Sequence, residues 1–214
     1  MSTIIFSMNL FYLLLLFPLI HARSQKAQLE NITNILTNAS FAFDNFSNAI
    51  ISFNGGNATN FFLAYDTLTD LVLKPDLKTM RQTKSLSGDH ALKVGPLIRD
   101  LAASIRGAMD GLVQQEEELE HIIIGNEFCE SVGPPWVFQA LLRLAILVKD
   151  LVREFLVRVP REMIQDGMFS ALEDIPKAFD GAWKEFEAKG VGKFGESTRT
   201  PVRRGMSTNC PKRH

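Results

Sequence analysis

Cysteine and histidine are scarce in this chain of 214 residues, which has only two cysteines and four histidines. Two cysteines are too few for a disulfide framework, so the fold must be held by a hydrophobic core, which a chain of this length can bury within one domain. The cysteines leave two alternatives open. Cys129 and Cys210 form a bridge, or Cys129 is a buried thiol and Cys210 a free one.

The sequence also lacks the common catalytic and metal-binding motifs. A helical carboxylate metal centre needs two Glu-x-x-His pairs, and this chain has one, Glu118 to His121, within an acidic run typical of a solvated helix face. The chain contains no His-Glu-x-x-His motif, no Gly-x-Ser-x-Gly elbow, no phosphate loop and no dinucleotide-binding glycine pattern. We therefore expect a protein that is not an enzyme and has no metal site and no cofactor.

A strong excess of charge is absent too, since the net charge is −1. Basic residues gather in the C-terminal segment, residues 190–214, and no basic stripe with interleaved aromatic residues marks a helix face, so nucleic-acid binding is not expected. The C-terminal segment is rich in Gly, Ser, Thr and Pro and is predicted to be a disordered basic tail. It has no hydrophobic stretch, which argues against a GPI anchor.

One strongly apolar run is present, at residues 4–20. Its dense centre is too short for a comfortable membrane span and contains Pro18. Followed by the small residue Ala22, the run is typical of a secretory signal peptide, residues 1–22, with cleavage after Ala22 or Ser24. One departure from the signal-peptide pattern is that no Lys or Arg precedes the run. An uncleaved signal anchor is the alternative. We expect no transmembrane segment after cleavage.

Four N-glycosylation sequons support secretion, at Asn31, Asn38, Asn45 and Asn57. An Asn-X-Ser/Thr sequon accepts a glycan only in the secretory pathway and only where the asparagine faces water. The first three are spaced by two helical turns, so they would share one face of a helix. We expect glycosylation at these sites, and the glycans would shield that flank from a ligand.

Apolar residues recur at helical spacing throughout residues 23–189, and no stretch alternates convincingly as a strand does. The predicted fold class is all-α, a bundle of about five amphipathic helices that forms one domain over residues 23–189. The first helix carries an apolar stripe with alternating steps of four and three residues, from Ile32 to Phe53. The expected helices span residues 26–53, 59–83 with an interruption at Pro75, 90–124, 134–159 and 160–189.

Prolines and glycines refine this picture. Pro96 should kink the third helix or mark its true start, and kinks at Pro75, Pro96 and Pro176 would spread the helices and leave room for a cavity. Gly107 and Gly111 allow a neighbouring helix to approach closely. The fourth helix is apolar over most of its girth, which predicts a central position in the bundle.

Several segments, covering most of residues 34–187, occur in the order and spacing of a known family. The segments are Ile51–Gly56, Ser85–Leu92, Val94–Leu101, Leu112–Leu119, Phe155–Pro160 and Ile175–Phe186. In these segments the chain resembles the fungal family of hydrophobic surface-binding protein A and cell-wall galactomannoproteins. The resemblance implies a secreted, glycosylated, non-enzymatic helical protein that adsorbs to hydrophobic surfaces or holds a fatty acid inside the bundle.

Two features depart from the family pattern. The chain is rich in phenylalanine, with 16 in all, and has Cys129, whereas relatives are richer in Ala, Ser and Lys. Its basic tail also replaces the Ser/Thr-rich region or lipid-anchor signal of some relatives. The partner implied by the resemblance is a fatty acid or a hydrophobic surface, and cell-wall polysaccharide is a further candidate.

The candidate ligand-binding residues are those expected to point inward near the middle of each helix. Tyr65 and Ser104 are candidate partners for a carboxylate head group, although Ser104 could instead bond to its own helix backbone. The apolar candidates are Phe46, Tyr65, Leu68, Leu101, Ile105, Leu142, Ile146, Leu172 and Phe179. Two other functions remain open, a structural cell-wall mannoprotein with a filled core and a secreted effector.

Overall fold

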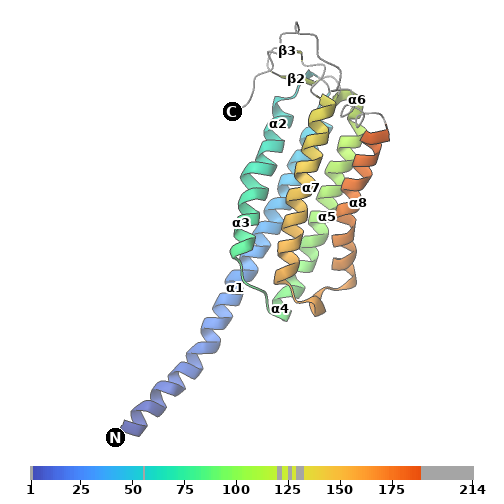
Figure 1. Ribbon diagram of the computed structural model, residues 1–214. Coiled ribbons are helices and arrows are strands. Elements are labelled where there is room, and N and C mark those ends of the chain that lie inside the picture. The colour runs from blue at the N-terminus through green and yellow to red at the C-terminus, as the bar shows by residue number, and fades with distance from the viewer. Residues whose placement is uncertain (1, 55, 120–121, 125–126, 129–132, 189–214) are drawn as a thin grey trace, which may run out of the picture.

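The computed structural model describes the backbone of residues 2–54, 56–119, 122–124, 127–128 and 133–188. It describes the side chains of residues 24–54, 58–119, 137–165 and 167–187. Both cysteines, His121 and the predicted tail at residues 190–214 lie outside these ranges. Within them the chain is an all-α bundle of long helices that run side by side (Figure 1), which confirms the predicted fold class.

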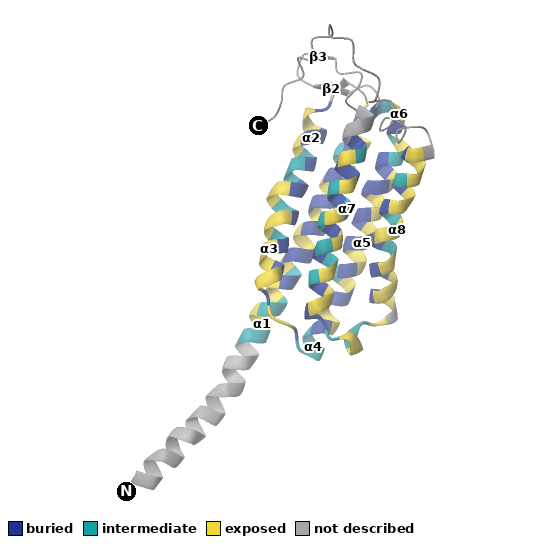
Figure 2. Ribbon diagram, viewed as in Figure 1, coloured by how far each residue is buried: buried dark blue, intermediate teal, exposed yellow. Residues whose placement is uncertain are grey.

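Helix α1, Ser2–Ile51, begins earlier than predicted and projects beyond the bundle at its N-terminal end (Figure 1). Its predicted stripe faces the core, since Phe43, Phe46 and Ile50 are fully buried. Asn31, Asn38 and Asn45 are exposed on the outer side, so the predicted orientation of this helix is confirmed. The side chain of Asn57 is outside the described residues. Figure 2 shows the same division between buried and exposed faces along the other helices.

The second predicted helix forms one continuous helical path from Thr59 to Gln82. It consists of α2 (Thr59–Asp66), a π-helical segment η1 (Thr67–Leu73) and α3 (Lys74–Gln82), with Pro75 in the first turn of α3. Proline has no N–H and its ring clashes with the carbonyl four residues earlier, so the wider π turn before Pro75 relieves the clash without ending the helix. The buried Thr69 hydroxyl donates to the Tyr65 carbonyl at 3.0 Å within this segment.

The third predicted helix is correct only in its middle. The chain forms α4 (Gly88–Ala91), a 3-10 turn η2 (Leu92–Val94), α5 (Gly95–Gln114) and α6 (Glu116–Leu119). Pro96 marks the start of α5, one of the two predicted outcomes. Gly107 and Gly111 lie against Ser47 and Ile50 of α1, where a β-carbon on Gly111 would lie 3.5 Å from Ile50 Cγ2.

The prediction that the third helix extends to residue 124 was wrong. Strand β2, Ile122–Ile124, pairs in parallel with β1, Gly56–Asn57, and antiparallel with β3, Glu127–Phe128. Three consecutive β-branched isoleucines favour extended backbone, and the strand meets the turn that follows α1. The sequence shows no convincing strand alternation, and these short strands lie beside a fold that is otherwise helical as predicted.

The last two helices are α7 (Gly133–Arg158) and α8 (Asp166–Ala188). The prediction that Pro160 opens the fifth helix was wrong, because Pro160 has an extended ψ of 134° and precedes a 3-10 turn, η3 (Arg161–Met163). Pro176 lies inside α8 as predicted. Helix α5 packs between α1 and α8, while α7 packs on α3 and α8. The predicted central position therefore belongs to α5 and not to α7.

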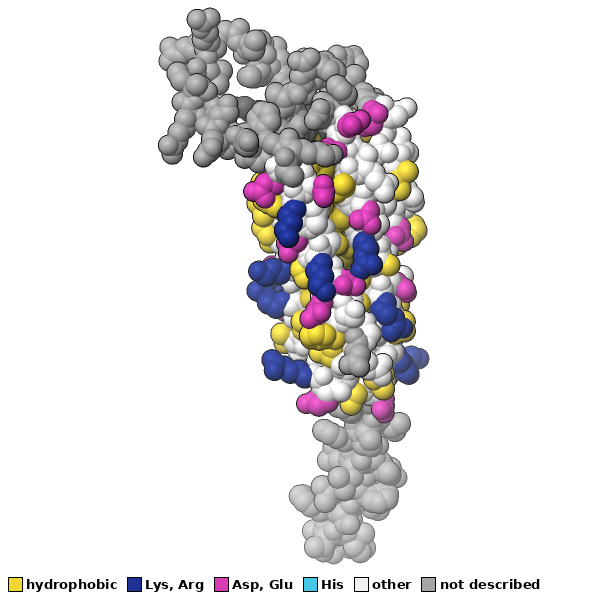
Figure 3. Space-filling view, turned by 90° about the vertical axis from the view of Figure 1, so that its right-hand side faces the viewer, with side chains coloured by type: hydrophobic (Ala, Val, Ile, Leu, Met, Phe, Trp, Pro, Cys, Tyr) yellow, Lys and Arg dark blue, Asp and Glu magenta, His cyan; other side chains and the backbone are white. Residues whose placement is uncertain are grey.

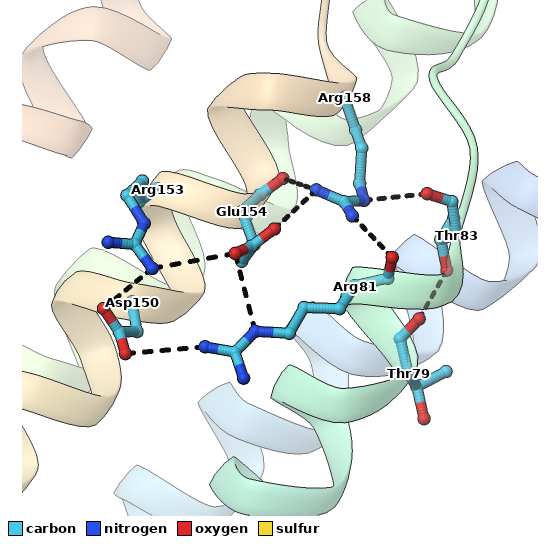
Figure 4. Close-up of polar contacts among 7 residues, drawn as sticks. All are labelled: Thr79, Arg81, Thr83, Asp150, Arg153, Glu154 and Arg158. Carbon is cyan, nitrogen blue, oxygen red and sulfur yellow. Dashed lines mark hydrogen bonds and ion pairs between the residues drawn. The ribbon is translucent and has the colours of Figure 1, made fainter.

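A polar network joins the C-terminal ends of α3 and α7 (Figure 4). The buried Arg158 donates from Nε to the Thr83 carbonyl at 2.8 Å and from Nη2 to the Arg81 carbonyl at 2.8 Å. Its Nη1 lies 2.6 Å from the Glu154 carbonyl oxygen and 2.9 Å from Glu154 Oε2. The carbonyls of a last helical turn have no partner within the helix, so Arg158 caps α3 from the neighbouring helix.

Candidate functional site

An apolar groove of about 400 Å³ lies between α7 and α8. Helix α7 contributes Ala145, Val148, Lys149 and Val152, which lie at steps of three and four residues and so share one face. Helix α8 contributes Leu172, Ile175, Pro176, Phe179 and Asp180 at the same spacing. Two facing stripes from antiparallel neighbours thus form its walls. Its volume is within the range of small-molecule pockets, about 300–1,000 Å³.

The sequence explains why these two helices leave space between them. Ala145 is a small residue at one end of the α7 wall, and Pro176 interrupts the hydrogen bonding of α8 at the centre of the opposite wall. Beyond the groove, the rings of Phe138 and Trp183 pack against each other with centroids 3.6 Å apart, which holds α7 and α8 together at that end.

The groove carries one cation and one anion, Lys149 and Asp180, both exposed. Within the described part of the chain, neither side chain forms an ion pair. An ammonium group beside an apolar wall can bind the carboxylate of an amphipathic ligand while the wall covers its hydrocarbon part. This arrangement suits a ligand with one acidic end and one apolar end.

A second cavity, of about 530 Å³ between α5 and α8, is more polar. Its cations are already paired, since Arg106 Nη2 lies 2.7 Å from Asp174 Oδ2 and Lys177 Nζ lies 3.6 Å from Asp174 Oδ1. Lysine, arginine, aspartate and glutamate are intermixed with hydrophobic side chains on the face that Figure 3 shows. A carboxylate ligand would have to displace these pairs, so the α7–α8 groove is the better candidate.

Most of the predicted site residues lie in the packed core. Phe46 and Tyr65 come together, with ring centroids 6.0 Å apart, and Phe46 also packs on Phe61 at 5.7 Å. Leu172 and Phe179 line the α7–α8 groove. The others that are buried but do not line that groove are Leu68, Leu101, Ser104 and Ile105.

The expectation that Leu142 and Ile146 point inward was wrong, because 49% and 53% of their surfaces are exposed. Helix α7 is apolar on nearly every side, so its sequence does not say which side is buried. The structure buries Leu141, Leu144 and Val148 instead. Leu142 and Ile146 then lie one turn apart on the outer face.

The two candidate head-group partners already have partners in the protein. The Ser104 hydroxyl lies 2.8 Å from that of Ser40 on α1, so it bonds across to a neighbouring helix. Burial raises the pKa of Tyr65, while the charge of Arg143 and a hydrogen bond with it act in the opposite direction. Arg143 Nη2 also lies 2.6 Å from Asp70 Oδ1, and a hydrogen bond from Lys74, with a contribution from Arg143, lowers the pKa of Asp70.

Sequence reasoning missed Lys149, together with Ala145, Val148 and Val152 on α7 and Ile175 and Pro176 on α8. The usable signal was a single lysine beside an apolar stripe of α7, facing a helix with an internal proline. Finding the groove also requires the register of α7 against α8, which periodicity within one helix does not contain.

Two absences apply to the part of the chain that the structure describes. No cluster of three or more His, Cys, Asp or Glu residues there could hold a metal ion. No helix in the same part of the chain combines the length and the apolar character needed to cross a bilayer.

The fold is similar to solved fungal protein structures. Ligand-binding domain 1 of the Penicillium marneffei MP1 protein, solved with arachidonic acid, superposes with a TM-score of 0.64 at 18% identity, covering 74% of this chain and 98% of that one. Domain 2 of the same protein, also solved with arachidonic acids, gives 0.63 at 18% identity, covering 73% and 94%. Afmp4p, solved with palmitic acid, gives 0.62 at 17% identity, covering 74% and 99%.

Comparisons of sequence add nothing to this likeness. No protein-family profile matches the chain, and no curated protein matches it significantly. At 17–18% identity the structural likeness establishes a shared fold, the all-α bundle.

Proposed function

We propose that this chain is a secreted, glycosylated, non-enzymatic protein of the cell-wall galactomannoprotein type that binds a fatty acid between α7 and α8. The observation that carries the proposal is the apolar groove with Lys149 at its rim, a lysine without an ion-pair partner in the described part of the chain. The proteins of similar fold that were solved with arachidonic or palmitic acid support it. The predicted signal peptide and exposed sequons support secretion and glycosylation.

The size of the groove sets the expected affinity. The α7 wall from Ala145 to Val152 is about 10 Å long at 1.5 Å per residue, so it covers part of a long acyl chain. Burial contributes about 0.8 kcal/mol per methylene, and about eight methylenes would give about 6 kcal/mol. An energy of about 6 kcal/mol corresponds to a dissociation constant of tens of micromolar, and association also costs translational and rotational freedom, so we expect binding in the range of tens of micromolar or weaker rather than nanomolar.

The test uses delipidated protein, palmitate and native mass spectrometry or calorimetry. Ala145→Phe places a ring in one end of the groove and should weaken palmitate binding at least tenfold, an energetic loss of about 1.4 kcal/mol. Ile146→Phe is the matched control, because it adds a ring one residue away on the outer face of α7. Lys149→Met should weaken palmitate but not a fatty alcohol of equal length. Unchanged binding by Ala145→Phe, or no binding by the native chain at hundreds of micromolar palmitate, would refute the proposal.

Two other functions each have an observation in their favour. The core around Phe43, Phe46 and Phe61 is filled by side chains, which favours a structural mannoprotein without a ligand. The exposed Leu142, Ile146 and Val157 on α7 favour adsorption to a hydrophobic surface. In the palmitate titration the first predicts no binding by the native chain. The second predicts that Ile146→Ser, and not Ala145→Phe, reduces adsorption to oil or plastic.

A further inference from the structure

A second apolar groove, also of about 400 Å³, lies between α1 and the α2–η1 segment, in the N-terminal half of the chain. Phe41 and Leu63 line it with 65% and 63% of their surfaces exposed. Its polar lining comes from Asn38, Asn45 and Thr67, and none of its lining residues is charged. A large aromatic ring left open to water in a groove points to a partner that covers it.

The positions of Asn38 and Asn45 suggest what covers the ring. Both begin predicted glycosylation sequons, both are exposed, and both line this groove on either side of Phe41. Phe41 is three residues after Asn38 and four before Asn45, so all three share one face of α1. Asn31 carries a similar sequon on the same helix but does not line the groove.

Helix geometry favours Asn45 over Asn38. Side chains of an α-helix lean toward its N-terminus and cover the surface of the preceding turn. A glycan on Asn45 therefore leans over Phe41, whereas one on Asn38 leans away from it, toward Asn34. The two sequons are thus equivalent in sequence but not in the surface that they cover.

We infer that the first N-acetylglucosamine of a glycan on Asn45 packs against Phe41 and occupies the α1–α2 groove. A pyranose has an apolar face of C–H groups that suits an aromatic ring, and its acetamido methyl suits an apolar groove, while the hydroxyls remain in water. A fatty acid fits less well because no cation lines this groove, in contrast to the α7–α8 groove with Lys149. The inference rests on the secretion and glycosylation of the proposed function, but not on its lipid binding.

The experiment uses the full chain secreted from a eukaryotic host that attaches high-mannose glycans. Glycopeptide mass spectrometry first measures occupancy at each sequon. One portion is then trimmed by an endoglycosidase that leaves a single N-acetylglucosamine on asparagine. Another is stripped by an amidase, which hydrolyses the side-chain amide, removes the sugar and leaves an exposed aspartate; the Asn31 chain undergoes the same change and so controls for the added charge. The melting temperatures of the two portions are compared for chains that keep only the Asn45 sequon or only the Asn31 sequon.

With Asn45 alone, we expect the trimmed form to melt about 2–4 °C above the stripped form. With Asn31 alone, the two should melt together. Phe41→Ala, which should not impair folding because the ring is exposed, should abolish the Asn45 difference. In the trimmed form, an NMR Overhauser contact should join the acetamido methyl to the Phe41 ring.

Four results would overturn the inference. They are an unoccupied Asn45 in secreted protein, a difference equal to that at Asn31, a difference that survives Phe41→Ala, and a groove that binds palmitate with its glycan in place. Retention of palmitate binding in the α7–α8 groove would show that only this inference had failed. A chain that stays inside the cell with its leader intact would overturn the proposed secretion as well.

Discussion

Replacing Arg158 by alanine should be among the most destabilising single changes in the described chain. The side chain is only 10% exposed, and its partner Glu154 is 18% exposed. The substitution removes donors to the Thr83 and Arg81 carbonyls and to Glu154. The Thr83 and Arg81 carbonyls then lose their donor, at about 1–3 kcal/mol each, while Glu154 keeps its ion pairs with Arg81 and Arg153. We therefore expect a total loss of about 3–5 kcal/mol, which comes mainly from the two carbonyls.

Urea unfolding measures this loss as a decrease in the free energy of unfolding. In a thermal melt, at about 2–4 °C per kcal/mol, the same loss should lower the melting temperature by about 6–20 °C. Arg158→Lys keeps the charge but not the planar fork that reaches several acceptors, so it should lose about half as much. Hydrogen exchange should accelerate in the last turn of α3, which Arg158 caps from α7.

Arg153→Ala is the matched control. Arg153 belongs to the same cluster (Figure 4) but is 62% exposed, at 3.3 Å from Asp150 and 3.7 Å from Glu154. Exposed pairs of this kind contribute about 0–1 kcal/mol. If Arg158→Ala loses no more stability than Arg153→Ala, the bonds seen at Arg158 do not hold α3 to α7, and the reasoning from burial is refuted.

Two further predictions concern polar groups at helix interfaces. Burial raises the pKa of Asp76 to about 6 from 3.8. The folded chain therefore binds more protons than the unfolded chain between about pH 4 and 6. As a result, the free energy of unfolding should fall as pH rises through that window. Asp76→Asn should flatten this dependence in urea titrations and stabilise the chain at pH 7 by about 1–3 kcal/mol; an unchanged pH profile would contradict it. Ser104→Ala should lower the free energy of unfolding by about 1 kcal/mol. The Ser40→Ala/Ser104→Ala double variant should lose less than the two single variants combined, because no hydroxyl is then left without its partner. Strictly additive losses in a double-mutant cycle would show that the pair does not interact.

Periodicity predicted helix positions well where a helix has one apolar side. In α1 the stripe through Phe43 and Phe46 alternates with hydrophilic positions, and this contrast fixed both the buried face and the exposure of Asn38. In α7 apolar residues occur on every side, so Leu142 and Leu141 are indistinguishable by hydropathy. Their different burial depends on where α3 and α8 lie, which is tertiary information.

Local chemistry also gave ambiguous signals at helix ends. Pro96 starts α5 whereas Pro160 precedes a separate 3-10 turn, although both positions are compatible with the first turn of a helix. Ile122–Ile124 continues an apolar helical pattern but forms a strand, because a partner strand, Gly56–Asn57, lies beside it. A contact between segments so distant in the chain overrides local propensity.

The distribution of packing explains why a ligand would lie between α7 and α8 rather than at the centre. The aromatic contacts of Phe46, Phe53 and Phe61 fill the buried core between α1 and α2, inside the surface groove of these helices, and α5 approaches α1 closely at Gly111. Opening that side would break dense packing, whose loss is costly at every buried methylene. Helix α8 packs mainly on α5 and less extensively on α7, with Pro176 already interrupting its hydrogen bonds along the groove. If the proposed function holds, an acyl chain longer than the groove would part α7 from α8 at the cost of few contacts besides the Phe138–Trp183 pair, while Arg158 keeps the other side of α7 fixed to α3.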